Sequence, residues 1–252
     1  MQTLILAGGQ GTRISEHTKF IPKPMVKIGK KPILCHIIDI YLKYKFNDFV
    51  IAVGFKSEVI KKYFLLKNKP NIKKEELSNF LKKRKLIFNF KNYKLTIIET
   101  GLYSQTGDRV VKSFRHMNKQ NFFLTYGDGL SNINIKKLYK FHNKNNSLLT
   151  VTAVTQPPRF GQLILKNKTV KEFAEKKIKS SQLISGGFFV VNPDFVSKIK
   201  KNTMFEIETV NHFVKKKKVK AFVHKGFWQC MDTKREKDLL EEIYKKEIPW
   251  LK

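Results

Sequence analysis

The sequence predicts an α/β protein with an open, mostly parallel central β-sheet that is flanked by helices. In the first half of the chain, short apolar runs of strand length alternate with stretches of helical periodicity. Strands separated by helices pair in parallel through right-handed crossovers. A glycine-rich turn also follows the first apolar run, where such sheets bind ligands. A chain of 252 residues with 41% hydrophobic content can bury the core of one domain, so we expect residues 1–252 to form a single domain.

The first elements follow from the spacing of apolar residues. Residues 3–7 have the pattern of a buried strand that ends at glycine, and residues 33–44 carry apolar side chains at helical spacing. Residues 49–54 repeat the strand pattern, and residues 57–64 predict a short helix with Ser57 as its N-cap. This alternation is typical of a Rossmann-like sheet.

The rest of the chain continues this pattern after a lysine-rich surface excursion at residues 65–94. We expect a helix at 73–83 and a strand at 86–90 within the excursion. Beyond it, the sequence predicts strands at 95–99, 122–126, 148–154, 161–165, 169–173 and 186–191, and helices at 135–144, 207–215 and 234–246. Because the strands shorten after Pro157 and Pro158, we divide the domain into a part at about residues 1–150 and a part at about residues 151–252.

The charge of the chain is strongly positive, with 51 Lys and Arg against 20 Asp and Glu and a formal net charge of +31. Only six of the basic residues are arginine, the residue that base readout and bidentate phosphate binding favour. We therefore favour a general lysine bias over a nucleic-acid-binding surface, and expect no nucleic-acid partner.

The location of the protein is predicted from what the sequence lacks. The apolar runs fall short of the ~20 residues that a membrane-spanning helix needs, and the N-terminus does not resemble a secretory signal. The two cysteines, Cys35 and Cys230, have no metal-ligand spacing. We expect a cytoplasmic protein with reduced thiols and no membrane partner.

The turn after the first strand has the composition of a phosphate-binding loop. Gly8, Gly9 and Gly11 lack side chains, so backbone N–H groups can approach a phosphate closely, and Arg13 adds a permanent positive charge. Position 13 is not glycine and no Gly-Lys-Ser/Thr follows, which excludes a Rossmann fingerprint and a Walker A loop. An ordinary tight turn between strand and helix remains an alternative.

A lysine between two prolines follows ten residues beyond Arg13. Pro22 and Pro24 fix the backbone around Lys23 in an extended form, which lowers the entropy lost when its ammonium binds an anion. In isolation this motif would be a surface turn. After the glycine-rich turn, it resembles the second half of a triphosphate-binding site.

Two aspartates are candidate ligands of Mg²⁺. Asp128 lies between Gly127 and Gly129 at the end of an apolar strand, and Mg²⁺ in phosphate-binding sites takes one or two protein carboxylates. An Asp-Gly turn is the alternative for Asp128. Asp232 is the candidate second ligand, and it could equally be the N-cap of the helix that starts near Lys234.

Together these motifs resemble the sugar-1-phosphate nucleotidyltransferases, and most narrowly the glucose-1-phosphate cytidylyltransferases. The order and spacing of the general family are matched by Leu6–Arg13, Pro22–Met25, Gly29, Lys31–Ile33, Gly127–Gly129, Glu175–Lys176 and Gly186–Phe188. The narrower resemblance rests on Glu99–Gly101, Thr106–Arg109, Thr125–Gly129, Pro157–Gly161, Gly226–Gln229, Met231–Thr233, Pro249–Trp250 and the 65–94 excursion. The match covers essentially the whole chain and implies the fold of the nucleotide-diphospho-sugar transferases.

The resemblance implies a reaction and a role for each motif. CTP and glucose 1-phosphate would form CDP-glucose and pyrophosphate with Mg²⁺, in nucleotide-sugar synthesis for deoxysugars or surface polysaccharides such as O-antigen. It assigns nucleotide binding to Leu6, Ala7, Gly8, Gly9, Gly11, Thr12, Arg13, Lys23, Ser104, Arg109 and Gly127; catalysis to Arg13, Lys23 and Asp128; sugar-phosphate binding to Gly161, Glu175, Lys176 and Gly187; and metal binding to Asp128 and Asp232. The first part of the chain would hold nucleotide and metal, the second the sugar phosphate. The family also implies a homo-oligomer, with the 65–94 excursion as a candidate contact surface.

Four positions depart from the pattern of the family. Lys177 replaces a proline after Lys176, and Cys230 replaces a proline before Met231. Lys30 and Asp108 each replace a glycine, and we expect Asp108 to place a carboxylate beside the nucleotide pocket. Two alternatives therefore stay open. The same fold could use dTTP, UTP, GTP or another hexose 1-phosphate, or the chain could be a non-catalytic protein that binds anions or nucleic acid.

Overall fold

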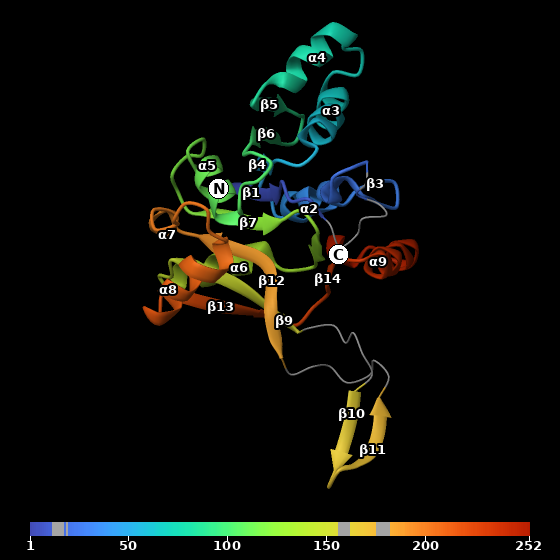
Figure 1. The fold of residues 1–252 in the computed structure, drawn as a ribbon, viewed down its shortest axis with the longest axis vertical. Coiled ribbons are helices and arrows are strands. Elements are labelled where there is room, and N and C mark those ends of the chain that lie inside the picture. The colour runs from blue at the N-terminus through green and yellow to red at the C-terminus, as the bar shows by residue number, and fades with distance from the viewer. Residues whose placement is uncertain (12–17, 19, 156–161, 175–181) are drawn as a thin grey trace.

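The structure is a computed structural model that describes residues 1–11, 18, 20–155, 162–174 and 182–252. Its centre is an eight-stranded β-sheet in these described residues (Figure 1). In spatial order the strands are β13 (Val219–His224), β9 (Leu149–Thr155), β12 (Leu183–Val191), β7 (Phe122–Tyr126), β1 (Gln2–Ala7), β4 (Asp48–Val53), β6 (Lys94–Glu99) and β5 (Lys85–Asn89).

The sheet is mostly parallel, which confirms the predicted fold class. Strands β7, β1, β4 and β6 run in the same direction, and so do β9 and β13. Strand β12 is antiparallel to both β7 and β9, and β5 is antiparallel to β6 at one edge. The pairing of Leu6 with Tyr126 brings the carboxyl ends of β1 and β7 together. The glycine-rich turn and Asp128 therefore begin at the same edge of the sheet.

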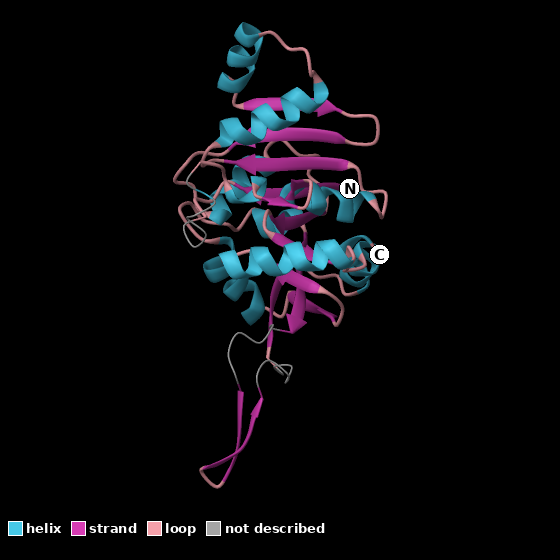
Figure 2. Ribbon diagram, turned by 90° about the vertical axis from the view of Figure 1, so that its right-hand side faces the viewer, coloured by secondary structure: helices cyan, strands magenta, loops and turns pink. Residues whose placement is uncertain are grey.

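Helices cover both faces of the sheet, as the view turned by 90° shows (Figure 2). They are α2 (Ile33–Leu42), α3 (Ser57–Asn68), α4 (Lys74–Lys82), α5 (Thr106–Phe114), α6 (Ile135–Lys144), α7 (Pro193–Val196), α8 (Val210–Lys215) and α9 (Lys234–Lys246). Shorter helices are the 3-10 turns η2 (Lys23–Met25) and η4 (Pro249–Leu251) and the π-helix η3 (Phe205–Thr209). No helix in the described ranges has both the length and the hydropathy to span a lipid bilayer.

Three two-stranded pairs complete the fold in the described residues. They are β2 (Lys27–Ile28) with β3 (Lys31–Pro32), β8 (Gly129–Ser131) with β14 (Trp228–Cys230), and the hairpin of β10 (Gln162–Lys166) with β11 (Thr169–Ala174). The hairpin lies away from the central sheet in Figure 1. The β8–β14 pair is the one that matters for the site, because it joins the segment after β7 to the segment before α9.

The core is divided by the sheet into two apolar layers. Alternate residues of β1 point to opposite faces, so Ile5 packs in the layer that contains residues of α2, α3, α6 and α9, whereas Leu4 packs in the layer with α5, α7 and α8. Both residues are fully buried. Burial on both faces explains why these strands have continuous apolar runs rather than alternating ones.

Several elements differ from the prediction. Ser57 is not an N-cap but the buried first residue of α3, and Lys56 takes the cap position with a positive φ of 48°. Helix α5 and strands β8, β13 and β14 were not predicted. Strand β13 has mixed burial at the edge of the sheet, and α5 has a helix-disfavouring glycine, Gly107, in its first turn.

Candidate active site

Two cavities lie at the carboxyl ends of β1 and β7. The first, of about 350 Å³, is lined by the turn after β1, the Lys23 segment and the start of α5, and we call it the nucleotide cavity. The second, of about 410 Å³, is lined by β12, β14 and residues of η3, and we call it the sugar cavity. Tyr126 and Asp128 line both cavities, so a ligand in each would meet beside Asp128.

The nucleotide cavity collects most of the residues that the sequence predicted for nucleotide binding. It is lined by Leu6, Ala7, Gly8, Gly9, Gly11, Lys23, Ser104, Arg109, Gly127 and Asp128. Gly11 has a φ of +65°, a conformation that favours glycine, and a Cβ on Gly8 would meet the guanidinium of Arg109 at 2.2 Å. Glycine is therefore favoured at position 11 by the backbone and at position 8 by the close approach of Arg109, whereas position 9 has room for a side chain.

Lys23 is the buried cation of the site. The predicted extended backbone at Lys23 is wrong: only Pro22 is extended, and Lys23 begins the 3-10 helix η2, where Pro24 is accepted in the first turn. The Lys23 residue is only 8% exposed. Its Nζ lies 2.6 Å from Oδ2 of Asp128 and also bonds to Oδ1 of Asp232. Burial lowers the pKa of the ammonium, but the two carboxylates outweigh burial and raise the pKa above its ordinary value. Lys23 therefore stays charged at neutral pH.

Asp128 and Asp232 are brought together by the β8–β14 pair. Gly129 of β8 pairs with Cys230 of β14, and the N–H of Met231 donates to the carbonyl of Asp128 at 2.9 Å. The alternative role of Asp232 as an N-cap is wrong. The side chain of Thr233 caps α9 and forms a capping box with Glu236, so the carboxylate of Asp232 is directed to Lys23.

The two aspartates form a donor set that fits Mg²⁺. Their oxygens converge on one ammonium nitrogen, which shows that both carboxylates can reach a single cation. Mg²⁺ is held by one or two carboxylates together with substrate phosphates, and the nucleotide cavity next to Asp128 has room for these phosphates.

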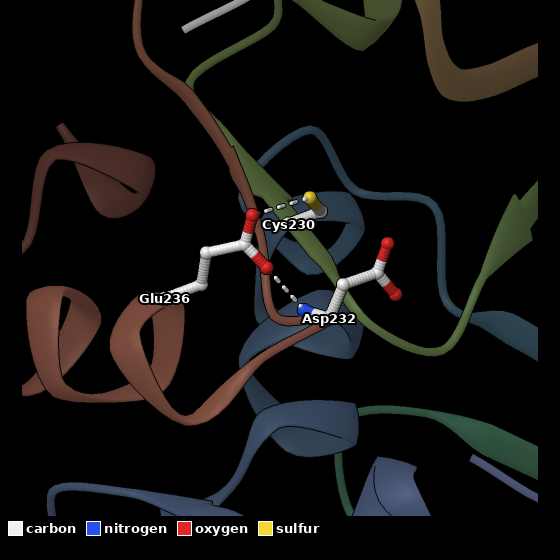
Figure 3. Close-up of side chains that lie close together, drawn as sticks. All are labelled: Cys230, Asp232 and Glu236. Carbon is white, nitrogen blue, oxygen red and sulfur yellow. Dashed lines mark hydrogen bonds between the residues drawn. The ribbon is translucent and has the colours of Figure 1, made fainter. Parts of the chain in front are cut away.

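A second acidic group beside the site does not form a chelating site. The ligand atoms of Cys230, Asp232 and Glu236 lie within 4.8 Å of one another, but the carboxylate of Asp232 points away from the other two side chains (Figure 3). Oε2 of Glu236 accepts the N–H groups of Asp232 and Thr233 at 2.7 and 3.0 Å. Burial and nearby carboxylates raise the pKa of the Cys230 thiol to about 12, so this group stays protonated.

Arg109 connects the loops around the nucleotide cavity. It is 4% exposed, and its guanidinium donates to the carbonyls of Gly8 and Gly101, both at 2.9 Å, and to Oγ1 of Thr100 at 2.7 Å. Burial lowers the pKa of this guanidinium. The predicted nucleotide contact of Arg109 stays a prediction. The hydrogen bonds show that the side chain also has a structural role. It fixes the glycine-rich turn against the loop after β6.

Asp108 is next in sequence to Arg109 of the nucleotide cavity, but its carboxylate is not part of the lining of that cavity. Asp108 is the N3 residue of α5, and its oxygens accept the N–H groups of Gln105 at 3.4 Å and Asn202 at 3.1 Å. Ser104, by contrast, does line the cavity, and its hydroxyl accepts a hydrogen bond from Lys112 at 2.7 Å. Because Asp108 caps a helix, its substitution for glycine leaves the nucleotide cavity free of added negative charge.

The sugar cavity contains residues that sequence reasoning missed. Gly187, which was predicted, lines it with a φ of +74°, and a Cβ there would lie 2.9 Å from the Tyr126 ring. Glu206 also lines it, and its carboxylate accepts hydrogen bonds from the hydroxyls of Tyr126 and Thr106. Trp228 donates to the carbonyl of Gly186 at 2.7 Å. No local motif singles out Glu206, although π-helices such as η3 are frequent at functional sites.

The remaining predicted residues lie outside the described residues. They are Thr12, Arg13, Gly161, Glu175 and Lys176. Their roles stay predictions from the resemblance.

Comparison with known protein families shows which family the chain belongs to. Residues 2–247 match the model of the nucleotidyl transferase family. The chain belongs to this family. It is 39% identical over 244 residues to a probable glucose-1-phosphate cytidylyltransferase of Bacillus subtilis strain 168, with 96% of this chain and 94% of that protein covered. It is 38% identical to the glucose-1-phosphate cytidylyltransferase of Salmonella typhimurium strain LT2, with 99% and 98% covered.

Solved structures of other nucleotidyltransferases share the fold. A crystal structure of a putative glucose-1-phosphate thymidylyltransferase from Bacillus anthracis has a TM-score of 0.69 at 18% identity, with 96% of this chain and 94% of that chain covered. The apo structure of a UDP-glucose pyrophosphorylase has the same TM-score at 17% identity, with 97% and 98% covered. At these identities the likeness concerns the fold alone.

Proposed function

We propose that this nucleotidyltransferase is a glucose-1-phosphate cytidylyltransferase, which joins CTP and glucose 1-phosphate to form CDP-glucose and pyrophosphate. The two cytidylyltransferase relatives support this activity because they align with nearly the whole chain. The observation that carries the proposal is the convergence of Lys23, Asp128 and Asp232 at the boundary between two cavities. The reaction needs charge neutralisation where two phosphate-bearing substrates meet.

In the proposed reaction, CTP occupies the nucleotide cavity and glucose 1-phosphate the sugar cavity. An oxygen of the sugar phosphate attacks the α-phosphorus of CTP, the bond to the β-phosphate oxygen breaks, and pyrophosphate leaves. A phosphate monoester is already a nucleophile, so no general base is required. Catalysis is then positioning together with neutralisation of charge.

We assign this positioning and charge neutralisation to residues of this chain as follows. Backbone N–H groups of Gly8 and Gly9 approach the phosphates. The charged ammonium of Lys23 would neutralise them when a metal ion replaces it between Asp128 and Asp232. We assign Arg13 to the triphosphate, and Glu175 and Lys176 to the sugar and its phosphate, from the resemblance.

Members of this family generally use a divalent metal ion, and we propose Mg²⁺ for this protein. Asp128 and Asp232 would hold it, because their carboxylates converge on one cation. When bound, the ion neutralises charge that builds up on the phosphates in the transition state.

We further propose that the protein is a cytoplasmic homo-oligomer that contributes to deoxysugar or surface-polysaccharide synthesis. The excursion at residues 65–94 is the proposed contact surface. Its described elements include α4, which has no fully buried residue and whose Leu77 and Phe80 are half-buried against the core. Light scattering of the full chain tests assembly, and a monomer at all concentrations would contradict it.

The decisive experiment measures pyrophosphate release from glucose 1-phosphate with CTP, dTTP, UTP and GTP, with and without Mg²⁺. We expect CTP to be used best and chelation to stop turnover. Equal use of the four nucleotides would refute the cytidylyl assignment and leave the broader one. No release with any nucleotide, together with heparin or DNA binding that persists in high salt, would favour the non-catalytic anion-binding alternative.

A further inference from the structure

A third cavity, of about 610 Å³, lies next to the nucleotide cavity and is lined by four basic side chains. Lys112 and Arg115 come from the end of α5, and Lys200 and Lys201 come from the segment after α7. We call it the basic cavity. Ser104 lines both this cavity and the nucleotide cavity, so the two are separated by the loop after β6.

The basic cavity has more positive than negative side chains in its lining. Among the described residues, none of its four cations lies within ion-pair distance of an acidic group. Asp108 is the acidic residue of its lining, and its oxygens accept backbone N–H groups of Gln105 and Asn202. Four cations against the one carboxylate of Asp108 leave this concave surface with a net positive charge, which attracts an anion that carries several charges.

The walls of the cavity are held in place. Its two basic segments are about 90 residues apart in sequence, yet the N–H of Gly107 donates to the carbonyl of Thr203 at 3.1 Å, and Asp108 bonds to Asn202 at 3.1 Å. Gly107 is required for this approach, since a Cβ there would lie 2.6 Å from the Thr203 oxygen. Lys112 is positioned by its bond to the carbonyl of Thr100 at 2.8 Å. The cavity therefore exists before any ligand binds.

The cavity also offers apolar surface beside the cations. Val111 and Ile199 contribute to its lining, and Tyr103, whose residue is 85% exposed, presents an uncovered aromatic ring at its edge. A base can stack on such a ring. A volume of about 610 Å³ lies within the range of small-molecule sites, roughly 300–1,000 Å³.

We propose that the basic cavity is a second site for a polyphosphate group, distinct from the nucleotide cavity. Lys112, Arg115, Lys200 and Lys201 neutralise the polyphosphate, and Tyr103 stacks on a base when the ligand is a nucleotide. The shared chemistry is the polyphosphate, whether it comes from a nucleoside diphosphate or from free pyrophosphate. Binding here does not depend on the proposed cytidylyl transfer, so its test uses binding rather than turnover.

The test titrates the full chain with pyrophosphate and, separately, with CDP by calorimetry in the absence of divalent ions. We expect two classes of site in the wild-type protein for at least one of the two probes. Lys200→Gln combined with Lys201→Gln should weaken the affinity of one class of site by about ten-fold or more, because it removes charge-assisted hydrogen bonds to the ligand. The affinity of the other class should not change. Both lysines are exposed, so these changes spare the core.

The matched control replaces Lys215, the last residue of α8, and Lys216, its C-cap, with glutamine; both are also exposed. It removes the same charge from another surface and should leave both classes intact. An equal loss of affinity in both double variants would show a diffuse effect of net charge and would overturn the proposal. The proposal would also be overturned if the wild type showed only one class of site with both pyrophosphate and CDP. Tyr103→Ser separates the sources: selective loss of CDP affinity identifies a nucleotide, and unchanged affinities identify pyrophosphate.

Discussion

Replacing Lys23 with glutamine should destabilise the protein when no divalent ion is present. The substitution removes the charge between Asp128 and Asp232, whose carboxylates then repel each other. Breaking a buried ion pair by removing one partner costs about 3–5 kcal/mol. Lys23 and Asp232 side chains are 11% and 16% exposed, and that of Asp128 is 28% exposed. Solvent screens part of the repulsion, so we expect a loss of about 2–3 kcal/mol in the free energy of unfolding.

The assay is thermal unfolding of the wild type and Lys23→Gln, with a chelator or with excess Mg²⁺. For a chain of this size the loss corresponds to a fall in Tm of about 4–12 °C in the chelator. Mg²⁺ should restore most of it, because a bound cation replaces the ammonium and stabilises the folded state by mass action. Mg²⁺ should stabilise the wild type less, since Lys23 already neutralises both carboxylates.

Lys31→Gln is the control, because the Lys31–Asp39 pair is about one-third exposed and lies outside both cavities. It should change Tm little and should not respond to Mg²⁺ more than the wild type does. If Lys23→Gln unfolds at the wild-type temperature in chelator, or gains no more from Mg²⁺ than the wild type, the reasoning about the converging carboxylates is wrong.

Three further variants test other parts of the molecule. Asp128→Asn should abolish Mg²⁺-dependent turnover and keep the far-UV circular dichroism of the wild type; turnover near the wild-type rate would disprove the metal role. Glu206→Gln should raise the KM for glucose 1-phosphate by about ten-fold, the value of one charged hydrogen bond, with little change for CTP, and Glu208→Gln is its exposed control; equal effects on both substrates would refute this assignment. Burial lowers the pKa of His142 from 6.5 to about 4, so its contribution to stability is present above pH 6.5 and is lost as the pH falls toward 4. His142→Asn should flatten this acid loss, on the order of 2–3 kcal/mol, in unfolding measured from about pH 7 to about pH 4, and an unchanged slope would contradict the assignment.

Local sequence patterns predicted the elements that have clear apolar spacing and turn residues at their ends. The strand at residues 122–126 and the helices at 135–144 and 234–246 have the predicted bounds, because apolar spacing and flanking turn residues act over a few residues. Helix α5 was missed: it has Gly107 in its first turn, and its N-terminus is marked by a capping box of Gln105 and Asp108 rather than by a common N-cap residue. The antiparallel direction of β12 depends on pairing with β7 and β9, and no local pattern specifies such pairing.

In the candidate site, too, some features were predicted from local sequence and others depend on tertiary contacts. Glycines at 8, 9 and 11, the Pro-Lys-Pro motif and the Gly-Asp-Gly turn are local signals, and they predicted a phosphate-binding site with a metal ligand. The role of Asp232 stayed open, although Thr233 with Glu236 three residues later is the signature of a capping box and favours Thr233 as the cap. The contributions of Glu206 and Tyr126 to the sugar cavity could not be predicted, because they depend on contacts between η3, β7 and α5.

The sequence by itself therefore determined the fold class, the glycine-rich turn and the identity of the charged groups. Only the tertiary structure decided that Lys23 lies between two carboxylates, one of them 209 residues away. That contact requires β1 and β7 to be neighbours and β8 to pair with β14. Backbone preferences and apolar periodicity act over one or two turns of chain, whereas the convergence of distant side chains follows from strand order, which is fixed by the packing of the whole core.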